Sequence, residues 1–83
     1  MEQKIKQDAI QVGENIRRLR KARNIGQLEL AVKLQLKDVP MTREALGKIE
    51  RGKQHIKFSQ LRAIKEILNA SYDDLFTEEY KKY

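Results

Sequence analysis

The chain has 83 residues, which is enough for one compact domain and too few for two. Its 18 lysines and arginines outnumber its 12 aspartates and glutamates, and the net charge of +6 favours an anionic partner such as nucleic acid or an acidic membrane surface, unless it serves solubility alone. The absence of cysteine excludes a disulfide framework and any site that needs a thiolate.

A first amphipathic helix is predicted to end near Asn24. Its apolar residues recur at helical spacing, and basic residues between them form an outer face. The apolar positions are Val12, Ile16 and Leu19, and the basic ones are Arg17, Arg18, Arg20 and Lys21. The apolar pattern extends back through Ile5 and Ala9, but Gly13 interrupts it. Residues 1–9 are therefore either a loose N-terminal arm or an extension of this helix.

A second, shorter helix is predicted after the turn residues Asn24 to Gly26. Residues 27–34 form a run that is rich in helix formers. The only proline of the chain, Pro40, disfavours helical geometry at Val39. We therefore expect a loop from Gln35 to Met41.

The sequence marks both ends of a third helix, over residues 42–51. Thr42 is a good N-cap, and Gly52 is the residue type favoured just after a helix. At 100° per residue, one side of this helix is apolar and the other is charged. The apolar side carries Ala45, Leu46 and Ile49, and the other side carries Arg43, Glu44, Gly47 and Lys48.

The charged side of the third helix has the chemistry that reading a major groove requires. Arginine and lysine donate to O6 and N7 of guanine, and glutamate accepts from N4 of cytosine. Exposed charges on a helix are also commonly just solvated. Periodicity alone leaves both interpretations open.

Two further helices complete a chain that is expected to be all-α. Apolar residues at helical spacing predict the fourth helix, and they are Phe58, Leu61, Ile64, Ile67 and Leu68. Ser71 can cap a short fifth helix, which carries Tyr72, Leu75 and Phe76. No β-alternation or internal repeat is visible. We expect one helical domain over residues 10–76 and a short tail over residues 77–83.

Three stretches of the chain resemble the helix-turn-helix domains of the phage repressor and Cro type, also called the xenobiotic-response-element family. They are GENIRRLRKARNIGQLELAVKL, TREALGKIERGK and LRAIKEILNASYDDLF, and the most specific elements are Gln27, Leu30-Ala31, Ile49, Glu50 and Gly52. The resemblance implies a five-helix, lambda-repressor-like domain that binds double-stranded DNA and needs no cofactor. The link between the second and third helices is longer than the turn usual in the family.

The resemblance also implies roles for individual residues. The positions that match base readers are Arg43, Glu44 and Lys48, and those that match contacts to the DNA backbone are Gln27, Thr42, Lys53 and His55. Arg20 and Glu50 match a structural ion pair between the first and third helices. Gly47 either lets the helix approach DNA closely or has no such role and is tolerated despite the unfavourable effect of glycine inside a helix. The expected function is sequence-specific transcriptional regulation, most simply repression.

Catalysis, metal binding and protein binding are the alternatives to DNA binding. An enzyme is not expected, because the chain has one histidine, no cysteine and no glycine-rich phosphate loop, and a small-molecule substrate is not expected either. The lone His55 has no partner at metal-ligand spacing, so a metal site is rejected. An antitoxin or adaptor that uses this fold to bind a protein partner stays open.

The residues near the two ends of the chain bear on its oligomeric state and its cellular location. Aromatic and apolar residues near the C-terminus are expected to close a homodimer, the alternative being that they form the edge of a monomeric core. These residues are Tyr72, Leu75, Phe76, Tyr80 and Tyr83. The first residues lack the apolar core of a signal peptide, and no stretch is long and apolar enough to span a bilayer. We therefore expect a cytoplasmic protein without a membrane partner.

Overall fold

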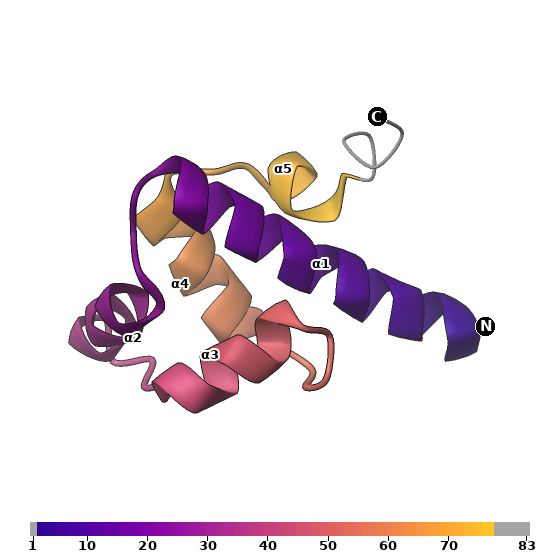
Figure 1. Cartoon of the computed structure of the whole chain (residues 1–83), viewed down its shortest axis with the longest axis horizontal. Helices are drawn as coiled ribbons and strands as arrows, with labels where there is room; N and C mark the ends of the chain where they lie inside the picture. Colours follow the sequence, from indigo (N-terminus) through magenta and orange to yellow (C-terminus); the bar gives the residue numbers. More distant parts are fainter. Residues whose placement is uncertain (1, 78–83) are drawn as a thin grey trace.

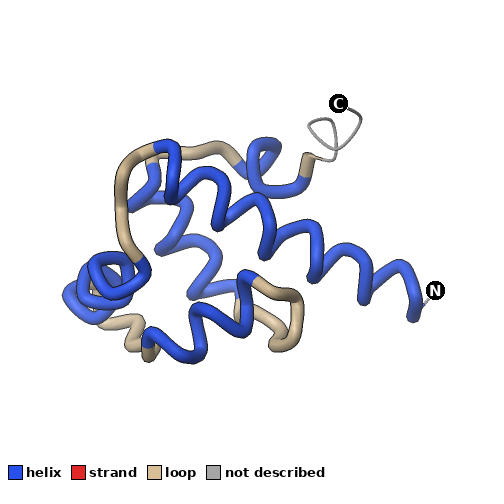
Figure 2. Tube along the Cα trace, in the orientation of Figure 1, coloured by secondary structure: helices blue, strands red, loops and turns tan. Residues whose placement is uncertain are grey.

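Five α-helices make up the computed structural model, which describes the backbone of residues 2–77 and the side chains of residues 11–77 (Figure 1). The helices are α1 (Glu2–Ala22), α2 (Gln27–Leu36), α3 (Arg43–Glu50), α4 (Phe58–Leu68) and α5 (Tyr72–Phe76). Figure 2 shows only helices and connecting loops over this range. The predicted all-α class and the five helices are confirmed.

Helix α1 is continuous from Glu2, so Gly13 does not interrupt it. Its N-terminal turns extend beyond the other helices, whereas its C-terminal half lies against them (Figure 1). The helix ends at Ala22, slightly before the predicted end, and Asn24 then adopts a left-handed backbone conformation with φ of 57°. Asparagine tolerates this region better than most residues, which explains the reversal of the chain before α2.

The core is built from the predicted apolar faces. Side chains from all five helices are buried in one cluster, among them Ile16, Leu30, Leu34, Leu46, Ile49, Ile64, Leu68 and Leu75. Close packing of this kind supplies most of the stability of short helices, because isolated helices of this length are marginal in water. The cluster therefore holds the eight-residue α3 in place, with its other face free.

The expected loop from Gln35 to Met41 is wrong in its first two residues, because α2 continues to Leu36. A left-handed residue, Asp38 (φ 61°), ends the helix. The N–H of Asp38 donates to the carbonyl of Gln35, and that of Val39 donates to the carbonyl of Leu34, both at 3.0 Å. This double closure is a Schellman motif, so α2 ends through backbone hydrogen bonds before Pro40 is reached.

The third helix begins and ends as its sequence predicts, within one residue. The Thr42 hydroxyl accepts from the N–H of Ala45 at 3.0 Å. At the other end, Gly52 has φ of 74°, and the N–H of Lys53 donates to the carbonyl of Lys48 at 2.8 Å. These contacts satisfy backbone groups that the ends of a short helix leave unpaired.

A buried asparagine fixes the C-terminal helix on α1. The side-chain amide of Asn15 donates to the carbonyls of Leu75 at 2.7 Å and Thr77 at 2.9 Å. Since α5 has only five residues, these bonds replace partners that a longer helix would have supplied. The predicted cap is present as well, because the Ser71 hydroxyl accepts from the N–H of Asp74.

Candidate nucleic-acid interface

A buried ion pair joins α1 to the end of α3. Nε of Arg20 lies 2.7 Å from Oε2 of Glu50, and Nη2 of Arg20 lies 3.0 Å from Oε1. The side chains are 8% and 1% exposed, so the two charges meet away from water. This is the contact that the sequence analysis expects between Arg20 and Glu50. Its bidentate geometry sets the position of the last turn of α3 relative to α1.

Glu50 also contacts the first residue of α2. Its Oε1 accepts from Nε2 of Gln27 at 3.0 Å, which fixes the amide of Gln27 beside α3. Arg20 in turn donates from Nη1 to the carbonyl of Ile25, two residues before α2, at 2.9 Å. One buried carboxylate therefore connects α1, α2 and α3, and a side chain at the start of α2 is oriented toward the outer face of α3.

The outer face of α3 borders a hollow of about 540 Å³. The lining residues are Gln27, Arg43, Glu44, Gly47, Lys48 and Arg51. The three predicted base readers thus lie together on one surface with Gln27. Arg43, Glu44 and Lys48 are exposed, so their charged groups are accessible from solvent. Two cations and one carboxylate on one short helix face form a set of donors and acceptors with spacing fixed by the helix.

Gly47 lies at the centre of this face, but it is more covered than the sequence analysis expects. The side chains of Gln27 and Arg51 shield it from solvent. A Cβ at this position would lie 3.4 Å from Nη1 of Arg51 and 3.7 Å from Nε2 of Gln27, which are ordinary contacts. The packing of the protein therefore has room for the methyl group of an alanine here.

Arg51 is a lining residue that the sequence analysis missed as a site residue. It is the C-cap of α3, is exposed, and extends its guanidinium over Gly47. The available signal was its spacing, because Arg51 follows Gly47 by four residues and so falls on the same helix face. It adds a third cation to the surface formed by Arg43 and Lys48.

The residues expected at the DNA backbone are not gathered at one point. Thr42 and Gln27 lie at the starts of α3 and α2, where free backbone N–H groups and the helix dipole favour anions. Lys53 and His55 are exposed on the connection between α3 and α4, outside the hollow. Thr42 therefore precedes α3 and Lys53 and His55 follow it along the chain, whereas Gln27 lies beside Gly47 on its outer face.

The family model described as helix-turn-helix matches residues 16–75. The chain belongs to the Cro/C1-type helix-turn-helix family. The match runs from the last third of α1 into α5 and includes every residue that lines the hollow. No curated protein and no solved structure matches the chain.

Membership of the helix-turn-helix family assigns the chain to a class of DNA-binding regulatory domains, which is not an enzyme class. In this class α2 and α3 are the helix-turn-helix pair, and the second helix of the pair is the one that enters the major groove. Here residues 37–42 connect the pair. In the part of the chain that the structure describes, no acidic, histidine or cysteine side chains cluster as a metal site would require, and no helix is both long and apolar enough to cross a bilayer.

The residues expected to close a homodimer differ in their exposure to solvent. Leu75 is fully buried, so it belongs to the core and is unavailable to a second copy, which corrects that part of the prediction. Tyr72 is partly exposed and Phe76 is exposed. Tyr80 and Tyr83 lie outside the described residues.

Proposed function

We propose that the protein is a sequence-specific transcription repressor that reads double-stranded DNA by inserting α3 into the major groove. The observation that carries the proposal is the shared surface of Arg43, Glu44 and Lys48 on the outer face of a helix-turn-helix reading helix. A single helix fits the width of the major groove of B-form DNA, and these side chains supply both donors and an acceptor for base edges. Repression would follow from occupancy of a promoter, with no cofactor.

Contacts to the sugar-phosphate backbone fix the position of α3 in this proposal. Gln27 and Thr42 contact phosphate from the helix starts, and Lys53 and His55 contact it from the connection after α3. Such contacts supply affinity and register, whereas contacts to base edges supply specificity. Arg51 joins the group because its guanidinium lies beside the readers. We assign these roles to residues 10–76, with residues 1–9 outside the DNA-binding unit.

Binding as a homodimer is part of the proposal, because one reading helix covers only a few base pairs. A row of stacked aromatic rings on α4 and α5 supports it: the ring centroids of Phe58 and Tyr72 are 6.3 Å apart, and those of Tyr72 and Phe76 are 6.4 Å apart. Phe58 and Phe76 are 65% and 52% exposed, which leaves apolar ring surface for a second copy. Two-fold related reading helices about 34 Å apart would contact half-sites on one side of the duplex.

Selection of bound duplexes from a random library, followed by titration of the winners at two salt concentrations, tests this function. A short two-fold-symmetric consensus with steep salt dependence supports sequence-specific binding by a dimer. A consensus without symmetry, bound by one chain per site, contradicts the dimer but retains the reading helix. If no sequence is enriched and binding stays weak at low salt, the DNA-reading function is wrong.

A further inference from the structure

Helix α2 is apolar on its outer side as well as on its core side. Its sequence, QLELAVKLQL, places an apolar residue at almost every second position, so apolar side chains point in all directions around the helix. Leu30 and Leu34 are fully buried, whereas Leu28, Val32 and Leu36 are 60%, 49% and 79% exposed. A helix that is apolar all round is normally covered on all sides. The outer side of α2 has no such cover within the described chain.

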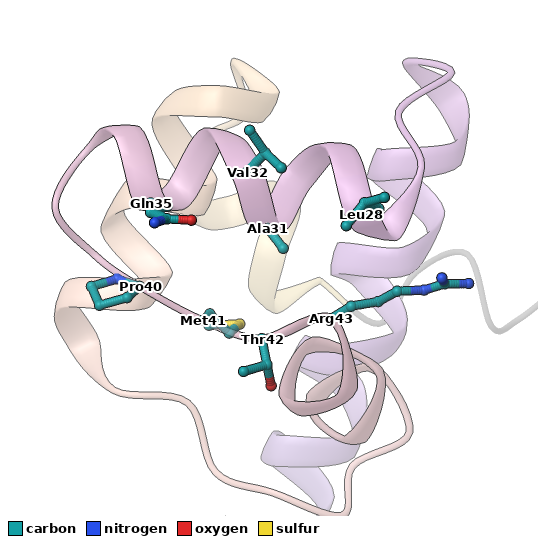
Figure 3. A pocket seen from close by; sticks show the side chains of 8 residues that line it. All are labelled: Leu28, Ala31, Val32, Gln35, Pro40, Met41, Thr42 and Arg43. Carbon is teal, nitrogen blue, oxygen red and sulfur yellow. The ribbon is translucent and has the colours of Figure 1, made fainter.

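Part of this outer side borders a groove of about 390 Å³ between α2 and the segment that leads into α3 (Figure 3). The α2 side of the groove is formed by Leu28, Ala31, Val32 and Gln35, and the opposite side by Pro40, Met41, Thr42 and Arg43. Most of this lining is apolar, and a row of apolar side chains along a helix beside a groove is the usual receptor for an amphipathic helix. Pro40 and Met41 belong to the link between α2 and α3, so this link forms one side of the groove.

Charge at the groove indicates the chemistry of its occupant. Arg43 is the charged residue among those that line the groove, and it lies at the end near Leu28. The exposed neighbours Glu29 and Lys33 on α2 carry opposite charges, so the charge at the groove itself is that of Arg43. The whole chain carries a net charge of +6. A second copy would bring like charges together at this face, whereas a partner with acidic residues beside its apolar stripe would complement it. No strand is present in residues 2–77, so a partner cannot bind by adding a strand to a sheet edge. Helix packing is the binding mode that the described residues offer.

We propose that this groove binds an amphipathic helix of a partner protein, whose apolar stripe packs on Leu28, Val32 and Met41 and whose acidic flank faces Arg43. Thr42 and Arg43 belong to the groove and also to the proposed DNA-contacting surface. Partner and DNA therefore exclude one another, and the partner relieves repression. This exclusion rests on the proposed DNA-reading function, but the docking itself does not.

A designed helical peptide tests the docking. It carries leucines on one face, glutamates on both flanks and a fluorophore, and its matched control has lysines in place of the glutamates. Binding is measured by fluorescence anisotropy with the full chain, and chemical shifts of the Ala31, Val32 and Met41 methyl groups locate it. We expect the acidic peptide to bind in the groove and the basic control to bind at least about tenfold more weakly, since like charges then face Arg43.

Two substitutions on α2 make the test specific to the groove. Val32→Asp places a charge among the lining residues and should weaken peptide binding about tenfold or more, because that charge would be desolvated. Leu36→Asp makes the same change at a more exposed residue of the same helix that does not line the groove, and it should change binding less than about twofold. Both variants should unfold at nearly the wild-type temperature, because Val32 and Leu36 are 49% and 79% exposed.

The outcomes distinguish failure of helix binding in the groove from failure of the proposed DNA-reading function, on which the competition between partner and DNA rests. Failure of the acidic peptide to bind, equal weakening by Val32→Asp and Leu36→Asp, or shifts confined to another surface would overturn the docking. A concentration-dependent dimer that Val32→Asp dissociates would assign the groove to a second copy instead. If the peptide binds in the groove but the duplex selected above does not displace it, the exclusion is wrong. If no duplex is bound at all while the peptide still binds, the DNA-reading function fails alone.

Discussion

The backbone of α1 at Gly13 lies directly against the carbonyl oxygen of Ile49 at the end of α3. A Cβ built on Gly13 would be 2.1 Å from that oxygen and 3.0 Å from the carbonyl oxygen of Glu50. Both neighbours are backbone atoms, so neither moves away without shifting α3 itself. The close approach brings Arg20 and Glu50 within reach of each other across the same pair of helices.

Gly13→Ala should therefore destabilise the fold. Alanine is intrinsically favoured over glycine in a helix by about 0.5–1 kcal/mol, but the clash outweighs this gain because overpacking costs about 1–3 kcal/mol or more. We expect the free energy of unfolding, measured by urea denaturation, to fall by about 1–3 kcal/mol. An unchanged or higher stability would mean that α1 and α3 are not packed this closely.

The sequence predicts the ends of the helices, but it does not predict the close packing of α1 against α3 at Gly13. Thr42, Gly52 and Ser71 act through hydrogen bonds and dihedral angles within a few residues, so local sequence predicts them. Gly13 is required by α3, which lies more than thirty residues further along the chain, and its spacing within α1 reads only as an interruption. The same limit applies to Asn15, whose partners are carbonyls at the far end of the chain.

The candidate site shows a similar division. Helical spacing alone separates the exposed charges of α3 from its buried face, and only family resemblance gave Arg20 and Glu50 as a pair. The hydrogen bond from Gln27 to Glu50 and the position of Arg51 over Gly47 depend on how α2 meets α3, which spacing within one helix does not describe. The sequence predicts the end of α2 two residues too early, because Pro40 gives a stronger signal in the sequence than Asp38, whose left-handed conformation follows the helix end at Leu36.

Gly47→Ala should have the opposite effect on stability from Gly13→Ala. The new Cβ makes only ordinary contacts with flexible side chains, so the helix propensity of alanine should raise the free energy of unfolding by about 0.5–1 kcal/mol. If α3 lies in the major groove and the side chains of Gln27 and Arg51, which cover Gly47, turn toward phosphates, the same methyl group faces the bases and weakens duplex binding. Paired denaturation and duplex titration check this. A more stable variant with unchanged DNA affinity would show that Gly47 does not face the bases.

Glu50→Ala should be among the most damaging single substitutions in the described chain. It leaves the Arg20 guanidinium buried without its carboxylate, and removing one partner of a buried ion pair costs about 3–5 kcal/mol. Lys37→Ala is the matched control, because its bridge to Glu66 spans 3.1 Å between side chains that are 42% and 52% exposed. An exposed pair contributes about 0–1 kcal/mol. Equal losses in thermal or urea unfolding would contradict the assignment of Arg20 and Glu50 as a structural pair.

Acid should weaken the attachment of α5 through Asp74. The backbone N–H and the hydroxyl of Ser71 hold the pKa of Asp74 below its ordinary value of 3.8. Because the folded-state pKa is lowered, the carboxylate stabilises the fold above the unfolded-state value, and this contribution is lost as the pH falls through the folded-state pKa. Asp74→Asn should therefore be less stable than the wild type at pH 6, with a smaller difference at pH 3. A constant difference in unfolding free energy at both pH values would rule out this linkage.

Arg43→Ala and Lys53→Ala should separate base reading from backbone contact. If Arg43 donates to guanine, its loss costs about 1–3 kcal/mol on the selected duplex and relaxes the preference at one base pair. Loss of Lys53 should instead weaken binding to every sequence by a similar factor and reduce the slope of log K against log salt by about one. Titration of each variant against the selected duplex and single-base-pair variants of it, at two salt concentrations, distinguishes the two patterns. An Arg43→Ala variant that loses affinity equally on all duplexes would be a backbone contact, and an unchanged salt slope for Lys53→Ala would place Lys53 outside the interface.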